Sequence, residues 1–225
     1  MAGRLLLVGT AHVLELALPL ERVLRTFDPG VVALELDRER WAALRAPMRP
    51  RRGPLLLRFL ASLQERLGEM LGAPPGSDML AAGRTAQRLG ARVALVDLPI
   101  GPTLQRAWQA LGWHERLALA RELAPLLVGA DLLTTRPATA DNPIATGDFS
   151  RELAEFAHRF PSLQRELIDR RDRYMARRLV ALLRDGQRVA AVVGEGHLAG
   201  LARRLDRVSP QVVPLSRLLE LGRQA

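Results

Sequence analysis

Two histidines stand three residues after a glycine, and each G-x-x-H segment closes a short apolar run. The first run is LLLVGTAH, ending at His12, and the second is VAAVVGEGH, ending at His197. The chain has four histidines and no cysteine, so a metal site here would use His, Asp or Glu ligands. Two neutral imidazoles and one carboxylate form a ligand set that suits a catalytic divalent metal with one position open for water.

Carboxylates follow the other apolar runs. The run VVALEL, residues 31–36, contains Glu35, and the run before Asp97 covers residues 93–96. Alternating apolar runs and helical stretches predict parallel strands, whose carboxyl ends meet at one edge of a sheet, where such folds bind ligands. Glu35 is therefore the carboxylate expected to join the two histidines, either as a metal ligand or as the general base.

The glycines of the two segments have a physical role of their own. Gly9, Gly194 and Gly196 allow the backbone to turn tightly after a strand and to approach a bound cofactor closely, so we predict them to be cofactor-binding. Two other interpretations stay open: glycine after a strand is ordinary turn chemistry, and Glu195 with Gly196 resembles an anion-binding loop at the start of a helix.

Charged residues also occur where the pattern predicts a core. Between residues 163 and 182 the apolar positions define one helical face, and Arg171 and Asp172 fall on it. One interpretation is a structural Arg–Asp pair, and the other is an arginine that holds a substrate carboxylate or an oxyanion. The roles of Asp37, which could cap the next helix, and of Asp97, which could serve only its turn, are open as well.

The elements that must position these residues predict an α/β fold: a small, largely parallel central sheet flanked by helices, with a mainly helical insertion in the middle of the chain. We expect one domain over residues 1–225, with the helix-rich insertion or lid at about 47–185. The strands are expected near residues 4–9, 31–36, 92–97 and 188–194, with a short last one at 211–213. The helices are expected at residues 19–27, 38–45, 55–71, 78–89, 103–111, 114–127, 148–159, 162–183, 197–205 and 216–221.

Composition limits the partners. The net charge is +9 and every basic residue is arginine, but only residues 45–54 form a basic cluster, and aromatic residues make up 4%, too few for base-stacking platforms. Nucleic acid is therefore an unlikely partner on composition. No apolar run reaches membrane-spanning length, and His12 and Glu15 interrupt the run that imitates a signal peptide. We expect a cytoplasmic protein; its oligomeric state, homo-oligomer included, is open.

Five ordered blocks carry a family resemblance: VGTAHV, VVALELDRER, ARVALVDLPIGPTLQRAW, LIDRRDRYMARRL and VVGEGHLAGL. Together they resemble the TraB/PrgY-like family, which is related to the Tiki metalloproteases and to erythromycin-esterase-like and haem-uptake ChaN-like proteins. The resemblance implies a metal-dependent hydrolase site at His12, Glu35, Arg171 and His197. The chain departs from the family pattern at Leu98, where an arginine is frequent, at Arg170, where a glutamate is common, and in ending without membrane spans.

The function expected from these observations is a metal-dependent, peptidase-like hydrolase acting on a peptide or small-molecule substrate. His12, Glu35 and His197 would hold Mn²⁺, Zn²⁺ or Co²⁺, while Arg171 would steady the oxyanion or orient Glu35. The alternative is a non-catalytic module that binds haem, a metal or a small ligand in the same cleft. A third possibility is an interaction protein that uses the basic cluster at residues 45–54 on nucleic acid or anionic lipid.

Overall fold

The computed structural model describes residues 4–11, 16–46, 76–127, 158–184 and 186–223. The chain divides into two compact units, one made of Met1–Ile100 with Arg171–Ala225 and the other of Gly101–Arg170. No helix among the described residues is both long and apolar enough to cross a lipid bilayer.

The first unit is built on a five-stranded sheet. Every pairing in it is parallel, and the strand order is β3-β2-β4-β1-β5. The predicted α/β class and parallel sheet are therefore confirmed. Its strands are β1 (Arg4–Thr10), β2 (Val31–Leu34), β3 (Arg92–Leu95), β4 (Arg188–Gly194) and β5 (Gln211–Val213).

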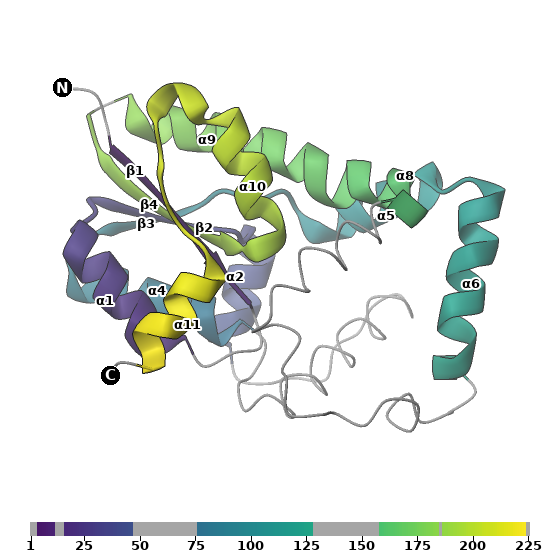
Figure 1. The fold of residues 1–225 in the computed structure, drawn as a ribbon, viewed down its shortest axis with the longest axis horizontal. Coiled ribbons are helices and arrows are strands. Elements are labelled where there is room, and N and C mark those ends of the chain that lie inside the picture. The colour runs from purple at the N-terminus through teal and green to yellow at the C-terminus, as the bar shows by residue number, and fades with distance from the viewer. Residues whose placement is uncertain (1–3, 12–15, 47–75, 128–157, 185, 224–225) are drawn as a thin grey trace. The chain divides into compact units, whose positions relative to one another are not determined.

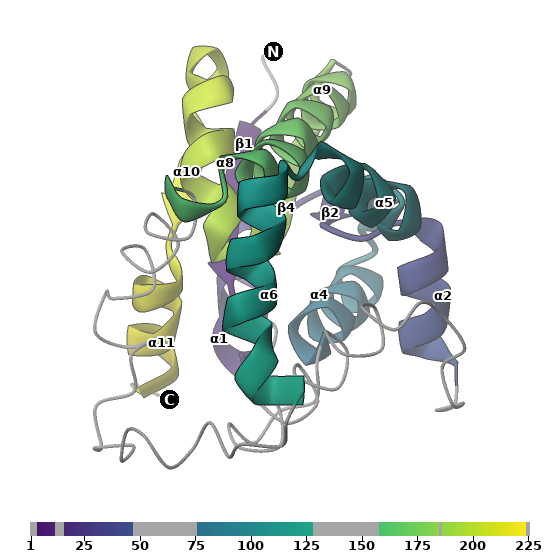
Figure 2. The same cartoon turned by 90° about the vertical axis from the view of Figure 1, so that its right-hand side faces the viewer.

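Helices cover both faces of this sheet (Figure 1). One face packs on α9 (Arg170–Leu183) and α10 (Glu195–Arg204), whose Met175, Leu179 and Leu201 share a core with alternate strand residues. The other face carries α1 (Ala17–Phe27), α4 (Ser77–Arg88) and α11 (Leu215–Arg223). The two helical layers stay on opposite sides of the strands after a quarter turn (Figure 2). The strands at the centre are buried on both faces, which explains their continuous apolar runs.

The helix α2 (Arg38–Arg45) lies beside α4. The indole of Trp41 packs against Gly83, and a Cβ at that glycine would overlap the ring. Leu44 in turn contacts Gly76, where α4 begins, so the two helices run antiparallel. This packing fixes the start of α2 close to the carboxyl ends of the strands. A short 3₁₀ helix, η2 (Asp206–Val208), leads from α10 to β5.

The second unit, in its described part, is helical. It contains α6 (Trp113–Leu127), α8 (Pro161–Gln164), the π-helical segment η1 (Arg165–Asp169) and most of α5 (Ile100–Ala110). Its core consists of Ala107, Leu111, Phe160 and Leu163. Glu115 accepts hydrogen bonds from the backbone N–H groups of Gly112 and Ser162, which ties α6 to α8.

Most predicted helices occur within one to three residues of their expected bounds, while 55–71 and most of 148–159 lie outside the described residues. The predicted single α-helix over residues 162–183 is interrupted by the π segment at Arg165–Asp169. A π turn takes one more residue than an α turn, so it shifts the side chains that follow. Apolar spacing alone does not reveal such an insertion, because the face resumes correctly in α9.

Candidate functional site

The parallel sheet places the ends of four strands along one edge. Thr10 is the last residue of β1, Glu35 follows β2 directly, Asp97 follows β3, and Gly194 ends β4. All three polar side chains at these ends are buried, although nothing in an apolar core would favour them there. The hydroxyl of Thr10 donates to the carbonyl of Val193 at 3.3 Å, so β1 and β4 stay joined at this edge.

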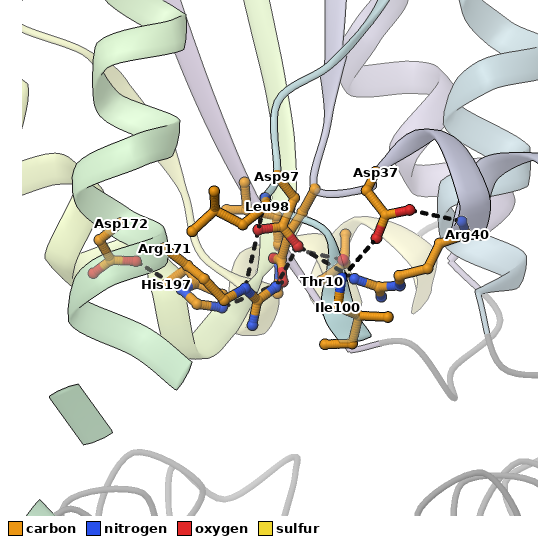
Figure 3. Close-up of polar contacts among 12 residues, drawn as sticks. Thr10, Asp37, Arg40, Asp97, Leu98, Ile100, Arg171, Asp172 and His197 are labelled. Carbon is orange, nitrogen blue, oxygen red and sulfur yellow. Dashed lines mark hydrogen bonds and ion pairs between the residues drawn. The ribbon is translucent and has the colours of Figure 1, made fainter. Parts of the chain in front are cut away.

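Glu35 belongs to a buried cluster of charged groups with Arg171 and His197. Figure 3 labels Asp97, Arg171, Asp172 and His197 of this cluster. Its Oε2 accepts the backbone N–H of Gly194 at 2.7 Å. Its Oε1 faces Nε2 of His197 at 3.2 Å and also accepts a hydrogen bond from Nη2 of Arg171. The carboxylate is only 3% exposed, so these partners replace the water that a charged group needs.

His197 is held by carboxylates on both sides. Its Nδ1 is 2.6 Å from Oδ1 of Asp172, and its Nε2 faces Glu35. Burial lowers its pKa, but the charge of Glu35 and the hydrogen bonds with Asp172 and Glu35 outweigh burial and raise the pKa of His197 to about 9. When no metal is bound, the imidazole of His197 is therefore protonated at neutral pH, and both ring nitrogens donate hydrogen bonds.

A helical glycine makes room for the Asp172–His197 contact. Asp172 lies on α9 and Gly200 lies on α10, one turn after His197. A Cβ at Gly200 would overlap Oδ2 of Asp172, so any larger residue would displace the carboxylate. The GEGHLAG sequence therefore contains both the histidine and the space for the residue that orients it.

Arg171 connects the ends of β2 and β3. Besides Glu35 it binds Asp97, with Nε donating to Oδ1 at 3.0 Å and Nη2 donating to Oδ2 at 2.7 Å. Burial acts to lower the pKa of Arg171, but the two carboxylates outweigh it and raise that pKa above the usual arginine value. The hypothesis of a structural pair between Arg171 and Asp172 is thus wrong, because Asp172 binds His197 and Arg171 binds Asp97 and Glu35.

Two acids whose roles the sequence left open do more than serve their own turns. Asp37 caps α2 by accepting the N–H of Arg40 at 2.9 Å, and its second oxygen accepts the N–H of Ile100 at 3.2 Å. Asp97 accepts the N–H of Leu98 at 2.7 Å as well as its bonds from Arg171. These contacts join the loops after β2 and β3.

Glu195, between the two glycines of GEGH, has a structural partner. Its Oε2 accepts the backbone N–H of Leu215 at 2.9 Å, at the start of α11. Burial raises the pKa of Glu195, although the hydrogen bond from Leu215 acts to lower it. A Cβ at Gly9 would overlap this same oxygen. Gly9 is therefore needed for close packing of β1 against α10, which is a sufficient reason for a glycine there.

The structure brings together three of the four predicted catalytic residues, Glu35, Arg171 and His197. The fourth, His12, lies outside the described residues; it stands two positions after the end of β1, the strand next to β4. The N–H of Gly194 contacts Glu35, whereas Gly196 lies in the first turn of α10. A role for these glycines in binding a cofactor stays a prediction.

Sequence reasoning missed Arg40 and did not find the partner of Asp172. Arg40 donates from Nη1 to Oδ2 of Asp97 at 3.3 Å. Two sequence features point to a buried partner for Asp172: its place on a core-facing side of its helix, and Gly200 in the helix that contains His197. The two other histidines, His114 and His158, are exposed in the second unit.

The profile of the TraB/PrgY/gumN family matches residues 2–209, nearly the whole chain. The chain belongs to the TraB/PrgY/gumN family. It is also 31% identical over 220 residues to the uncharacterized protein MJ1365 of Methanocaldococcus jannaschii, a match that covers 90% of this chain and 53% of the relative. This TraB-family chain thus spans about half the length of the curated relative that it matches.

An imidazole and a carboxylate, two side-chain types that can bind divalent cations, meet at this edge. Nε2 of His197 and Oε1 of Glu35 face each other, and the bond from Nδ1 to Asp172 gives the ring the orientation that metal-binding histidines usually have. No group of three or more such ligands occurs among the described residues. His12, which lies outside the described residues, is the third ligand that the sequence analysis expects, and any cation held by Glu35 would share that carboxylate with Arg171.

Proposed function

We propose that this TraB-family chain is a metal-dependent hydrolase with a peptide-like substrate. The observation that carries the proposal is the pairing of His197 with Glu35 at the strand ends, backed by Asp172 behind the imidazole. Burying ionisable groups costs desolvation free energy, and groups buried in this way occur preferentially at functional sites. The family membership supports the same reading, since the resemblance drawn from the sequence implies a hydrolase site at these positions.

Each residue would have a distinct task. His197 and Glu35 would hold the metal together with His12, and the metal would supply a water molecule of lowered pKa. Asp172 would keep the imidazole in the tautomer that presents Nε2. Arg171 would fix Glu35 in place and leave positive charge beside the oxygen that becomes negative when a carbonyl is attacked.

The test measures metal and turnover in the same samples. Purified protein is loaded with Mn²⁺, Zn²⁺ or Co²⁺, its metal content is measured by elemental analysis, and a peptide library is digested and read by mass spectrometry. His197→Gln and Glu35→Gln should lose both bound metal and cleavage. His114→Gln is the matched control, because that histidine is exposed in the second unit and should keep both.

Two results would overturn the proposal. One is unchanged metal content in a His12→Gln, His197→Gln double variant, and the other is the absence of cleavage in metal-loaded wild type. The non-catalytic alternative, with haem, metal or a small ligand in the same cleft, is tested by a haem titration of the same protein. A Soret shift without cleavage would favour that alternative.

A further inference from the structure

Arg40 is the partly exposed cation of the buried cluster. It lies in the first turn of α2, and its Nη1 donates to Asp97 Oδ2 at 3.3 Å. The Arg40 side chain is 30% exposed, whereas the side chain of Asp97 is fully buried. In Figure 3 it lies at one end of a row of charged groups, with Asp97 and Arg171 between it and His197.

Asp97 does not depend on Arg40. It already accepts two hydrogen bonds from Arg171, at 3.0 and 2.7 Å, and one from the N–H of Leu98 at 2.7 Å. A carboxylate has about four acceptor positions, and Arg40 occupies the remaining one at the longest distance of the four. If Arg40 moved to another anion, Asp97 would keep its three shorter bonds.

The guanidinium of Arg40 has N–H donors that make no hydrogen bond to the described residues. Arginine carries five N–H donors in a planar fork, and among the described residues only Nη1 of Arg40 makes a hydrogen bond. Nε and Nη2 are thus left without a partner in the described part of the chain. A partly exposed fork of this kind matches the two oxygens of a carboxylate, and such charge-assisted pairs are stronger than neutral hydrogen bonds.

Arg40 is also close enough to the proposed reaction centre for one short peptide to contact both. Three consecutive hydrogen bonds connect its Nη1 to Glu35 Oε1: Arg40 to Asp97, Asp97 to Arg171, and Arg171 to Glu35. At about 3 Å per bond, the two atoms lie within about 9 Å of each other. That separation is at most about three residues of extended chain.

From this geometry we infer that Arg40 binds the free C-terminal carboxylate of a peptide substrate, so that the enzyme removes one to three residues from the C-terminus. The inference rests on the proposed function, because it places the scissile bond at Glu35 and His197. The inference adds two points to the proposed function: the substrate has a free terminal carboxylate, and Arg40 of this chain selects it.

The experiment compares N-acetyl-trialanine as the free acid with its C-terminal amide. Binding of each to the metal-loaded full chain is measured by isothermal titration calorimetry. Wild type should bind the acid about ten- to hundred-fold more tightly than the amide. Arg40→Gln should bind both equally weakly, and Arg40→Lys should recover part of the preference. Arg38→Gln is the matched control: it removes one exposed charge from the same turn and should keep the full preference.

Cleavage by wild type and by Arg40→Gln is then measured on longer peptides with free or amidated ends. The products should be short C-terminal fragments, and Arg40→Gln should raise KM for the free acid much more than it changes kcat. Equal binding of acid and amide by wild type, or a preference that persists in Arg40→Gln, would overturn the inference. Absence of all cleavage would instead count against the proposed function, and the binding comparison would still decide on Arg40.

Discussion

Two glutamates in the first unit each contact two cations, but in opposite surroundings. Glu21 on α1 pairs with Arg25 at 2.9 Å and with Arg88, and these two arginine side chains are 58% and 50% exposed. Glu35 pairs with Arg171 and His197, whose side chains are 11% and 5% exposed. The same kinds of contact therefore occur once in water and once in the interior.

Burial determines what each cluster contributes to the stability of the protein. An exposed pair gains little, about 0–1 kcal/mol, because water already solvates both charges. A buried pair has lost that water, so its members depend on each other, and removing one leaves the others without compensation. A fold does not need such a cluster for stability alone, since apolar residues of similar volume often serve as well or better. Glu35, and not Glu21, is therefore the candidate for chemistry.

The largest effect is expected from removing Arg171. Arg171→Met keeps the apolar stem but removes the cation that Glu35 and Asp97 share, leaving Glu35 with His197 and Asp97 with the longer bond from Arg40. The free energy of unfolding should fall by about 3–5 kcal/mol. Glu21→Gln, at the exposed cluster, should change it by less than about 0.5 kcal/mol. Urea denaturation of both variants measures the two values.

A variant with a neutral cluster distinguishes the effect of unpaired charge on stability from the effect of changed side-chain shape. The triple variant Arg171→Met, Glu35→Gln, Asp97→Asn removes the unpaired charges and should recover a large part of the stability lost in Arg171→Met. If Arg171→Met were as stable as wild type, the contrast between the two clusters would be wrong.

The next effect is a pH dependence that belongs to His197. Its folded-state pKa of about 9 exceeds the value of about 6.5 expected for an unfolded histidine. The folded state therefore binds this proton more tightly, and the resulting stabilisation is complete below about pH 6.5 and is lost as the pH rises through 9. The loss is on the order of 3 kcal/mol in metal-free protein.

Denaturation at pH 6, 7, 8 and 9 with a chelator present measures that loss. The slope should disappear in His197→Gln and persist in His114→Gln, since His114 is exposed. A wild-type stability that stays constant over this pH range would contradict a doubly paired imidazole.

Much of this architecture was predictable from the sequence, for identifiable reasons. Buried parallel strands leave continuous apolar runs, and because ligands bind at strand ends, the sequence alone indicates Glu35 and His197 as site residues. The partner of Arg171 was not predictable, because Asp97 is 74 residues away in the chain and only the packing of α9 on the sheet brings them together. The π turn before α9 could not be predicted from apolar spacing, because the apolar face of the helix resumes after it.

Gly200 offers a smaller and sharper test of the buried cluster. Gly200→Ala changes no charge, but its methyl group would overlap Oδ2 of Asp172 and displace it from His197. We expect a loss of about 1–3 kcal/mol, the cost of a disturbed buried hydrogen bond, and a lower His197 pKa in a ¹⁵N NMR titration. Gly101→Ala has open space around its Cβ and should be neutral or slightly stabilising. An unchanged His197 pKa in Gly200→Ala would mean that Asp172 does not set it.

The smallest effect compares two aspartates that accept backbone N–H groups. Asp37 is buried and serves both Arg40 and Ile100, whereas Asp206 is exposed and serves Arg207 at 2.7 Å. Asp37→Ala should cost about 1–2 kcal/mol, because it removes a helix cap and leaves a second N–H without its acceptor. Asp206→Ala should cost a few tenths of a kcal/mol, since water replaces the carboxylate. Thermal unfolding measures both, and equal losses would show that burial does not govern how much these contacts contribute.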